Sequence, residues 1–342
     1  MSAVVGDERW VWPAGAATGV GSLPGTDPAE ALRTVFGELP DLPFLTELPG
    51  RGPGAELLGR TAGLLVELPV ELYAARWKLT GRPGRDLRRT RDLLARDLDE
   101  LVEVADGYSG VLKVAAGGPW TLAAGLDLPT GGAVLRDRGA LRDLAASLGE
   151  GVARLVADVA ARVPGASVLL QLDEPSLPAV LAGRVATESG FGTYPAVPEP
   201  DAADVLRGVL SAAGVPAVVH CCAPDVPVGL VRSAGAVGVA VDTALLPSDA
   251  AGMDRWGEAL DAGLGLFAGA VPVAPRRGAD ATAADTVRTY WHRLGLPAAT
   301  LPAQVVVTQS CGLAGATPDD ARAALRYARD AARRLADDPG TG

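Results

Sequence analysis

Residues 218–225, read VVHCCAPD, contain a histidine and two of the three cysteines of the chain. Imidazole nitrogen and thiolate sulfur are ligands that Zn²⁺ prefers, and soft thiolates select zinc over Mg²⁺ or Ca²⁺. Because side chains alternate along a strand, His220 and Cys222 would share one face, with Cys221 on the other as a small hydrophobic residue. The third cysteine, Cys311, lies far along the chain in QSCGL. A zinc site therefore needs a fold that brings Cys311 to His220.

A cysteine pair in an apolar strand is also typical of an ordinary buried core, where thiols pack as small hydrophobic groups. The H-x-C spacing lacks the C-x-x-C partner of a zinc knuckle, so this segment alone does not decide between a metal site and a core strand. The position of Cys311 at the end of another apolar run favours the metal site. Asp242 or a substrate would then be the fourth ligand.

Eight short apolar runs recur along the chain, each ending in glycine, proline or polar residues. Near-continuous apolar runs of this length are typical of parallel strands buried on both faces. We expect strands within 16–24, 44–49, 110–119, 167–175, 217–223, 236–246, 264–273 and 305–313. Helix-like segments separate them, and the inserts 52–105 and 120–163 would each hold two helices. This alternation predicts an α/β protein with a (β/α)8 TIM barrel, and a doubly wound sheet with a second lobe is the alternative.

Composition and charge exclude several classes of partner. Hydrophobic residues make up 48% of the 342 residues, enough for a large core, and the net charge of −10 argues against a nucleic-acid partner. No uncharged apolar stretch of about 18 residues predicts a membrane span, and the N-terminal MSAVVGDERW does not resemble a signal peptide. Three cysteines are too few for a disulfide framework. We expect a cytoplasmic single-domain protein over 1–342, with flexible ends at 1–14 and 337–342.

In a barrel, functional side chains come from the C-terminal ends of the strands and the loops that follow. Polar residues stand at these positions in six of the predicted strands. They are Ser22, Glu47, Asp173, Glu174, His220, Cys222, Asp242 and Cys311. Trp120 follows a Gly-Gly-Pro segment at the end of the third run, where its ring would either stack on a flat ligand or pack in the core.

In chain order, these segments resemble the C-terminal catalytic barrel of cobalamin-independent methionine synthases, within the methionine synthase/porphyrinogen-decarboxylase-like superfamily. The similar segments are TGVGSLPGT (18–26), FLTELPGRGPG (44–54), GGPWTL (117–122), QLDEPSL (171–177), HCC (220–222) and SCGL (310–313). QLDEP followed by H-x-C and C-G-L is a specific combination. Two features depart from the family. Its strand-seven H-S-P histidine has no counterpart in VPVAPRR (271–277), and its N-terminal half is missing here.

The resemblance implies a zinc-dependent methyltransferase that methylates the thiol of homocysteine, through a zinc-bound thiolate, to form methionine. Its zinc ligands would be His220, Cys222 and Cys311. The family's fourth ligand is a glutamate, for which Asp242 is the nearest candidate. Two cysteinate ligands add negative charge to the metal, so that a bound thiolate stays nucleophilic.

The resemblance also implies a binding site for homocysteine. Glu47 and Asp173 would hold its ammonium, and the Gly21–Ser22 backbone and hydroxyl would hold its carboxylate. No catalytic residue is expected beyond the metal site. The methyl donor would be methyl-tetrahydrofolate or a methyl-corrinoid on a carrier protein. Alternatives are zinc-dependent alkyl transfer to another thiol and a metal-free barrel of the porphyrinogen-decarboxylase type.

Overall fold

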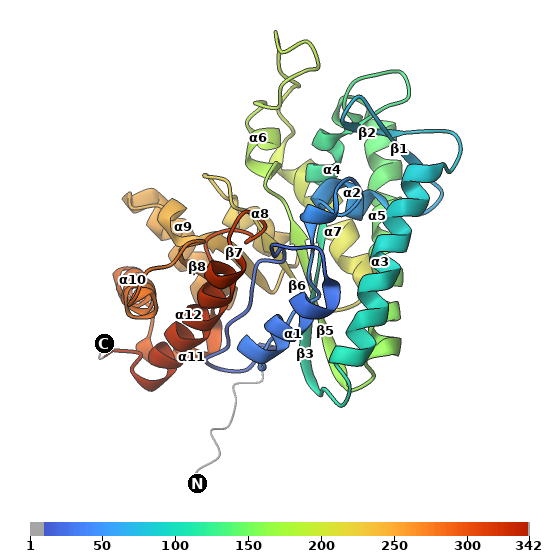
Figure 1. Cartoon of the computed structure of the whole chain (residues 1–342). Helices are drawn as coiled ribbons and strands as arrows, with labels where there is room; N and C mark the ends of the chain where they lie inside the picture. Colours follow the sequence, from blue (N-terminus) through green and yellow to red (C-terminus); the bar gives the residue numbers. More distant parts are fainter. Residues whose placement is uncertain (1–9, 341–342) are drawn as a thin grey trace.

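A curled parallel sheet forms the centre of the computed structural model, which describes residues 10–340 (Figure 1). Its strands, in spatial order, are β3 (Gly110–Gly117), β5 (Ala166–Asp173), β6 (Ala217–His220), β7 (Gly238–Asp242), β8 (Gly265–Val271) and β9 (Val305–Gln309). Each pairs in parallel with the next, as near-continuous apolar sequence predicts. Six of the eight predicted runs are therefore strands, and the sheet curls like half of a TIM barrel.

The two N-terminal runs do not form regular strands. They contribute isolated parallel bridges that join Ala17 to Val307, Ser22 to Glu47 and Phe44 to Lys113. Residues 16–22 thus lie beside β9 and residues 44–47 beside β3, at the open side of the half-barrel. A Cβ on Gly19 would lie 2.3 Å from the Phe44 ring, so the close packing of these segments requires glycine there. The full eight-stranded barrel predicted from the sequence is not shown in the described residues.

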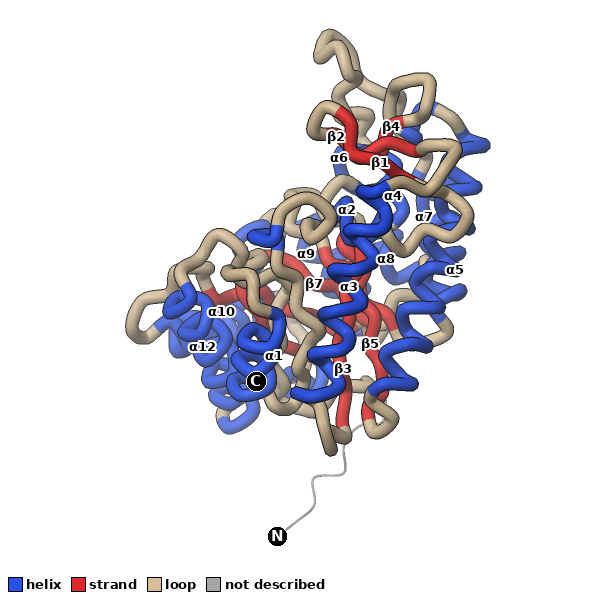
Figure 2. The backbone as a smooth tube through the Cα atoms, turned by 45° about the vertical axis from the view of Figure 1, so that its right-hand side comes forward, coloured by secondary structure: helices blue, strands red, loops and turns tan. Residues whose placement is uncertain are grey.

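Helices cover the outer face of the sheet (Figures 1 and 2). The longer ones are α1 (Pro28–Glu38), α3 (Arg85–Val104), α5 (Arg138–Arg162), α7 (Glu199–Ala213), α9 (Ala250–Asp261), α10 (Ala279–Arg293) and α12 (Pro318–Asp337). The shorter ones are α2 (Leu57–Ala62), α4 (Pro119–Gly125), α6 (Leu177–Leu181), α8 (Val228–Ser233) and α11 (Leu301–Gln304). The inserts 52–105 and 120–163 each contain two of them, as predicted. No helix within residues 10–340 combines the length and apolar character needed to cross a membrane.

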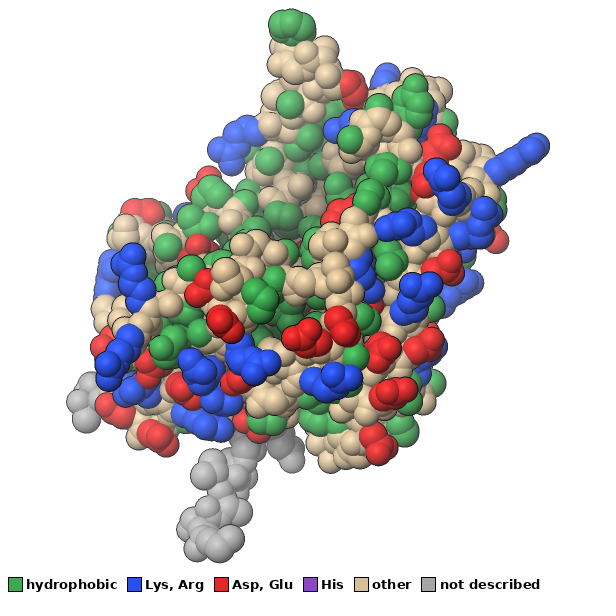
Figure 3. Space-filling model, viewed as in Figure 1, with side chains coloured by type: hydrophobic (Ala, Val, Ile, Leu, Met, Phe, Trp, Pro, Cys, Tyr) green, Lys and Arg blue, Asp and Glu red, His purple; other side chains and the backbone are tan. Residues whose placement is uncertain are grey.

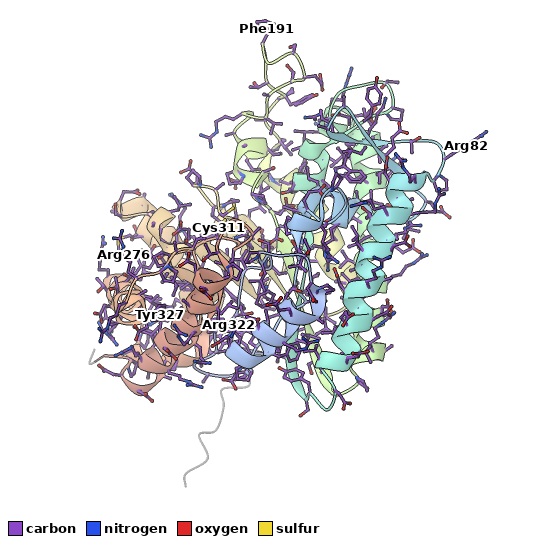
Figure 4. The ribbon with its side chains drawn as sticks, in the orientation of Figure 1. Arg82, Phe191, Arg276, Cys311, Arg322 and Tyr327 are labelled. Carbon is purple, nitrogen blue, oxygen red and sulfur yellow. The ribbon has the colours of Figure 1, made fainter. Side chains whose placement is uncertain are left out.

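Two additions rise above the strand ends at the top of the view. β1 (Val70–Tyr73), β2 (Arg76–Leu79) and β4 (Leu126–Asp127) form a second, small sheet (Figure 2). Residues 183–197, which we call the arm, follow α6 and carry Phe191 at their tip with 99% of its surface exposed (Figure 4). The Ala133 amide donates to Glu188 Oε1 at 3.0 Å and to Tyr194 Oη at 2.9 Å, which fixes the base of the arm.

Two tryptophans close the opposite end of the half-barrel. Trp10 and Trp12 are buried in an apolar cluster with residues of the strands, including Val111 on β3 and Phe267 on β8. The Trp12 indole packs edge-on against Phe267 and donates to Ala303 O at 3.1 Å. The flexible ends expected from the sequence lie partly outside the described residues, at 1–9 and 341–342. In the described part of the expected N-terminal end, residues 10–14, the side chains of Trp10 and Trp12 are buried.

Replacing Trp12 with alanine is expected to lower the free energy of unfolding by about 3–5 kcal/mol, because removing the indole leaves a cavity at the base of the half-barrel. Urea denaturation followed by circular dichroism measures the effect. Phe191→Ala is the matched aromatic control and should change stability by less than about 0.5 kcal/mol, because its ring is exposed. Equal stability of the two variants would show that the tryptophan cluster lies outside the cooperative core.

Candidate functional site

The predicted site residues lie at the C-terminal ends of neighbouring strands. Asp173 ends β5, His220 ends β6 and Asp242 ends β7. The register of the β5–β6 pair sets Asp173 directly opposite His220. Cys222 lies two residues beyond β6. Cys311, labelled in Figure 4, lies two residues beyond β9. The parallel topology thus gathers polar side chains from four strands at one edge of the sheet.

The two cysteines that are distant in sequence meet at this edge. The side chains of Cys222 and Cys311 interact. The interaction lowers the pKa of Cys311 to about 6 and raises that of Cys222, because the thiol of one stabilises the thiolate of the other. The positive charge of a protonated His220 would lower the pKa of Cys311 further, whereas the negative charge of Asp242 raises it. Cys221 is buried, and burial raises the pKa of its thiol to about 12, as expected for a core residue.

His220 has one engaged nitrogen and one free nitrogen. Its Nδ1 lies 2.8 Å from Asp173 Oδ1, and both side chains are buried. Because a carboxylate can only accept, the proton of this bond belongs to Nδ1, and in a neutral imidazole the lone pair is then on Nε2. Nε2 is buried and meets no hydrogen-bond partner among residues 10–340. A buried imidazole lone pair without a donor is the arrangement that a metal ligand needs.

The donor types at this edge fit zinc, although they do not surround a common point. Within the described part of the chain, no group of three or more His, Cys, Asp or Glu side chains is arranged to hold a metal ion. Cys222 is half-buried and Cys311 is exposed, so rotation of these side chains would have to draw the sulfurs toward His220 Nε2. Asp242 Oδ1 accepts from the Ala244 amide at 2.9 Å and thereby caps the turn Thr243–Leu245.

The residues expected to hold an amino acid lie beside the cysteines. Glu47 donates its amide to Gly21 O at 3.1 Å. A Cβ on Gly312 would lie 2.2 Å from Ser22 Oγ, so the hydroxyl sits against the residue that follows Cys311. The carboxyl of Glu47 is buried, which raises its pKa to about 7 against the opposing charge of Arg60. Its Oε1 lacks a hydrogen-bond partner in the described region, so this oxygen is free for an ammonium.

The side chains of Trp120 and Glu174 turn away from this group, toward α7 and the start of α4. Trp120 is fully buried, and its indole donates to Ala202 O on α7 at 3.1 Å, so the ring packs in the core. Stacking on a ligand would require the ring to be uncovered. Glu174 accepts from the amides of Trp120 and Thr121 at 2.9 and 2.7 Å, and burial raises its pKa to about 7. It therefore holds the start of α4.

Two residues of the site were not predicted from the sequence. Lys113 and Gln171 lie inside the half-barrel, fully buried, beneath Asp173. A lysine in the apolar run 110–119 was the available signal, because a lysine is almost never fully buried without a partner. The partner itself was not visible, since Gln171 lies on another strand.

A groove of about 950 Å³ opens beside the site. Residues 224–230, which follow Cys222, form one wall, and residues 245–249 form another. Trp256 and Val228 supply apolar surface, and Arg184 supplies a charge at the base of the arm. Figure 3 shows hydrophobic side chains gathered in a hollow below the arm. The groove is large enough for a partly apolar small molecule.

Comparison with solved structures bears on the fold. The chain is similar to a B12-independent methionine synthase from Shewanella sp. W3-18-1 in complex with selenomethionine, with a TM-score of 0.60 and 12% identity over 95% of this chain and 98% of that chain. The two proteins share a fold. A putative fructose-1,6-biphosphate aldolase from Coccidioides immitis covers 68% of this chain and 80% of its own, at 13% identity and a TM-score of 0.27, too low to support an argument. No protein-family model and no curated protein matches the chain.

Proposed function

We propose that this protein is a zinc-dependent methyltransferase that methylates the thiol of homocysteine to form methionine. The observation that carries the proposal is the contact between Cys222 and Cys311 beside the free Nε2 of His220. The shared fold supports it, because the neighbouring B12-independent methionine synthase was solved with selenomethionine, the selenium analogue of methionine. The buried carboxyl groups of Glu47 and Asp173 add a place for the ammonium of an amino acid.

His220, Cys222 and Cys311 would hold the zinc, and Asp242 is the nearest further donor. When bound, zinc would supply the charge that keeps a thiol deprotonated at pH 7, although a free thiol has a pKa of about 8.5. The protein's own part is to hold the imidazole proton on Nδ1 through Asp173, which leaves Nε2 available. Placing the acceptor sulfur against a methyl donor then favours in-line transfer.

The amino-acid end of homocysteine would be held by three side chains. The ammonium would donate to Glu47 Oε1, which lacks a partner in the described structure, and to Asp173. Ser22 Oγ, beside Gly312, would donate to the carboxylate. With these contacts, the substrate thiol would lie on the side of the cysteines. The groove behind Cys222 would receive the methyl donor, either methyl-tetrahydrofolate or a methyl-corrinoid on a carrier.

The purified protein is expected to contain about one zinc ion per chain, and Cys222→Ser and Cys311→Ser are each expected to lose most of it, because a tetrahedral site does not tolerate loss of a thiolate. Metal analysis by mass spectrometry after dialysis gives the result. Cys221→Ala is the matched control, since this buried neighbour faces the core, and it should keep its zinc. Full zinc content in either serine variant would refute the proposed site.

The substrates need a separate assay. Methionine formation from homocysteine is followed with methyl-tetrahydrofolate and, in parallel, with methylcobalamin as donor. Turnover with either donor supports the proposal, and the faster of the two shows whether the methyl donor is a folate or a corrinoid. A mercaptan without amino and carboxyl groups is the comparison for the acceptor, because it cannot use Glu47 or Asp173. Equal rates with this mercaptan would favour alkyl transfer to another thiol.

A further inference from the structure

A continuous chain of hydrogen bonds runs beneath the site from Lys113 to His220. Lys113 is fully buried, and its Nζ donates to Gln171 Oε1 at 2.7 Å and to Val20 O at 3.1 Å. Gln171 Nε2 donates to Asp173 Oδ1 and to Val20 O, each at 2.7 Å. Asp173 Oδ1 also accepts a hydrogen bond from His220 Nδ1 at 2.8 Å. Three neighbouring strands, β3, β5 and β6, supply these side chains.

The chemistry of the groups gives this chain of hydrogen bonds one direction. An ammonium has three donors and no acceptor, so it can bond Gln171 only through the amide oxygen. The amide NH₂ must then point the other way, toward Asp173 and the carbonyl of Val20. The Asp173 oxygen that faces His220 belongs to a carboxylate, which when ionised can only accept a hydrogen bond from Nδ1–H. Lys113 thereby fixes the orientation of an amide that could otherwise turn over.

The cost of burying Lys113 indicates that the position serves more than packing. A buried lysine is rare unless it is paired, and burial lowers the pKa of Lys113 to about 8 against the opposing effect of Asp173 and Glu47. Its neighbours along the apolar lining of β3 are aliphatic. A methionine of similar length would fill the space without a charge. Packing alone therefore does not explain why a lysine stands at this buried position.

We propose that Lys113 and Gln171 are positioning residues that set the tautomer of His220, holding its proton on Nδ1 and its lone pair on Nε2. For the zinc readout this inference rests on the proposed function. The tautomer itself does not depend on it. Outer hydrogen-bond partners of metal-binding histidines generally fix the ring orientation and tautomer in this way.

The tautomer can be measured directly, because the chain has only two histidines. His292 lies on α10, away from the site, and His292→Gln leaves His220 as the single imidazole. Nitrogen NMR of this ¹⁵N-labelled parent without metal distinguishes a protonated ring nitrogen from an unprotonated one. We expect a protonated Nδ1 and an unprotonated Nε2. A protonated Nε2 in the parent would overturn the proposal without any change at the site.

Lys113→Met and Gln171→Met are then introduced into this parent. In each, the share of the Nε2–H tautomer is expected to rise to roughly one half or more, because Asp173 loses its fixed orientation. Lys78→Met is the matched control, since Lys78 is the only other lysine and lies on β2. It should leave the tautomer unchanged. The two site variants interrupt the chain of hydrogen bonds at different points, so either one tests the inference if the other does not fold.

Zinc affinity, measured by competition with a coloured chelator, is the second readout. Both site variants are expected to bind zinc about 10–100-fold more weakly than the parent, and Lys78→Met equally well. An unshifted tautomer in both folded site variants would overturn the inference, even with zinc bound normally. Absence of zinc binding in the parent would refute the proposed function, whereas the tautomer shift would still decide the role of Lys113.

Discussion

Replacing Asp173 with alanine is expected to lower kcat/KM for homocysteine by about 10²–10⁴-fold. Two losses combine at this residue. Removing the partner of a histidine ligand costs about 10–100-fold, and losing a hydrogen bond to an ammonium costs about 1.5–3 kcal/mol, or roughly 10–150-fold. The first loss follows from the 2.8 Å contact with His220 Nδ1, and the second from the proposed substrate contact. Steady-state kinetics without added zinc measures the total, and a repeat with zinc in excess leaves the part due to the ammonium contact.

Asp173→Asn separates the two losses. The asparagine keeps an oxygen that can accept from His220 and Gln171, but it has no charge for the ammonium. We expect this variant to keep most of its zinc affinity while KM for homocysteine rises. If Asp173→Ala retained kcat/KM within fivefold, Asp173 would have neither role. If the asparagine variant lost zinc as fully as the alanine variant, charge rather than orientation would be the main contribution to His220.

The six central strands were predictable because a strand buried on both faces must be apolar at nearly every position. That signal weakens where two segments pack too closely for side chains. Gly19 lies against the Phe44 ring, and the segments on either side make isolated bridges instead of a ladder. The β1–β2 hairpin gave no signal, because Ala74 and Ala75 occupy its turn at φ 47° and 64°, where glycine or asparagine is usual.

For the candidate site, the sequence indicates which residue types stand at the strand ends and says little about their contacts. Strand-end positions indicate which side chains reach one edge of the sheet, and Cys222 and Cys311 do meet there. The same rule placed Trp120 near the edge, yet its ring turns toward α7, because a residue after a strand can point inward or outward. The partners of Lys113 depend on the register between β3 and β5, which pairs it with Leu169 and brings Gln171 within reach.

Glu47→Gln is expected to stabilise the protein at pH 8 while weakening its binding of homocysteine. Burial raises the pKa of Glu47 from 4.5 to about 7 in the folded state. Between these values the folded protein holds a proton that the unfolded chain has lost, so the stability from this group falls as the pH rises. Above pH 7 the buried charge costs roughly 1–3 kcal/mol, which the neutral glutamine avoids. Thermal unfolding at pH 5 and pH 8 measures the difference.

In the same variant the activity is expected to fall, although the stability at pH 8 rises. An ammonium binds the ionised form of Glu47, so kcat/KM for homocysteine is expected to rise through a step near pH 7 in the unaltered protein. Glu47→Gln should lose this step and raise KM by roughly 10–100-fold, the value of a charge-assisted hydrogen bond. Glu103→Gln, on the exposed face of α3, is the control and should change neither quantity. A pH profile that keeps its step in Glu47→Gln would assign the titration to another group and remove Glu47 from the ammonium site.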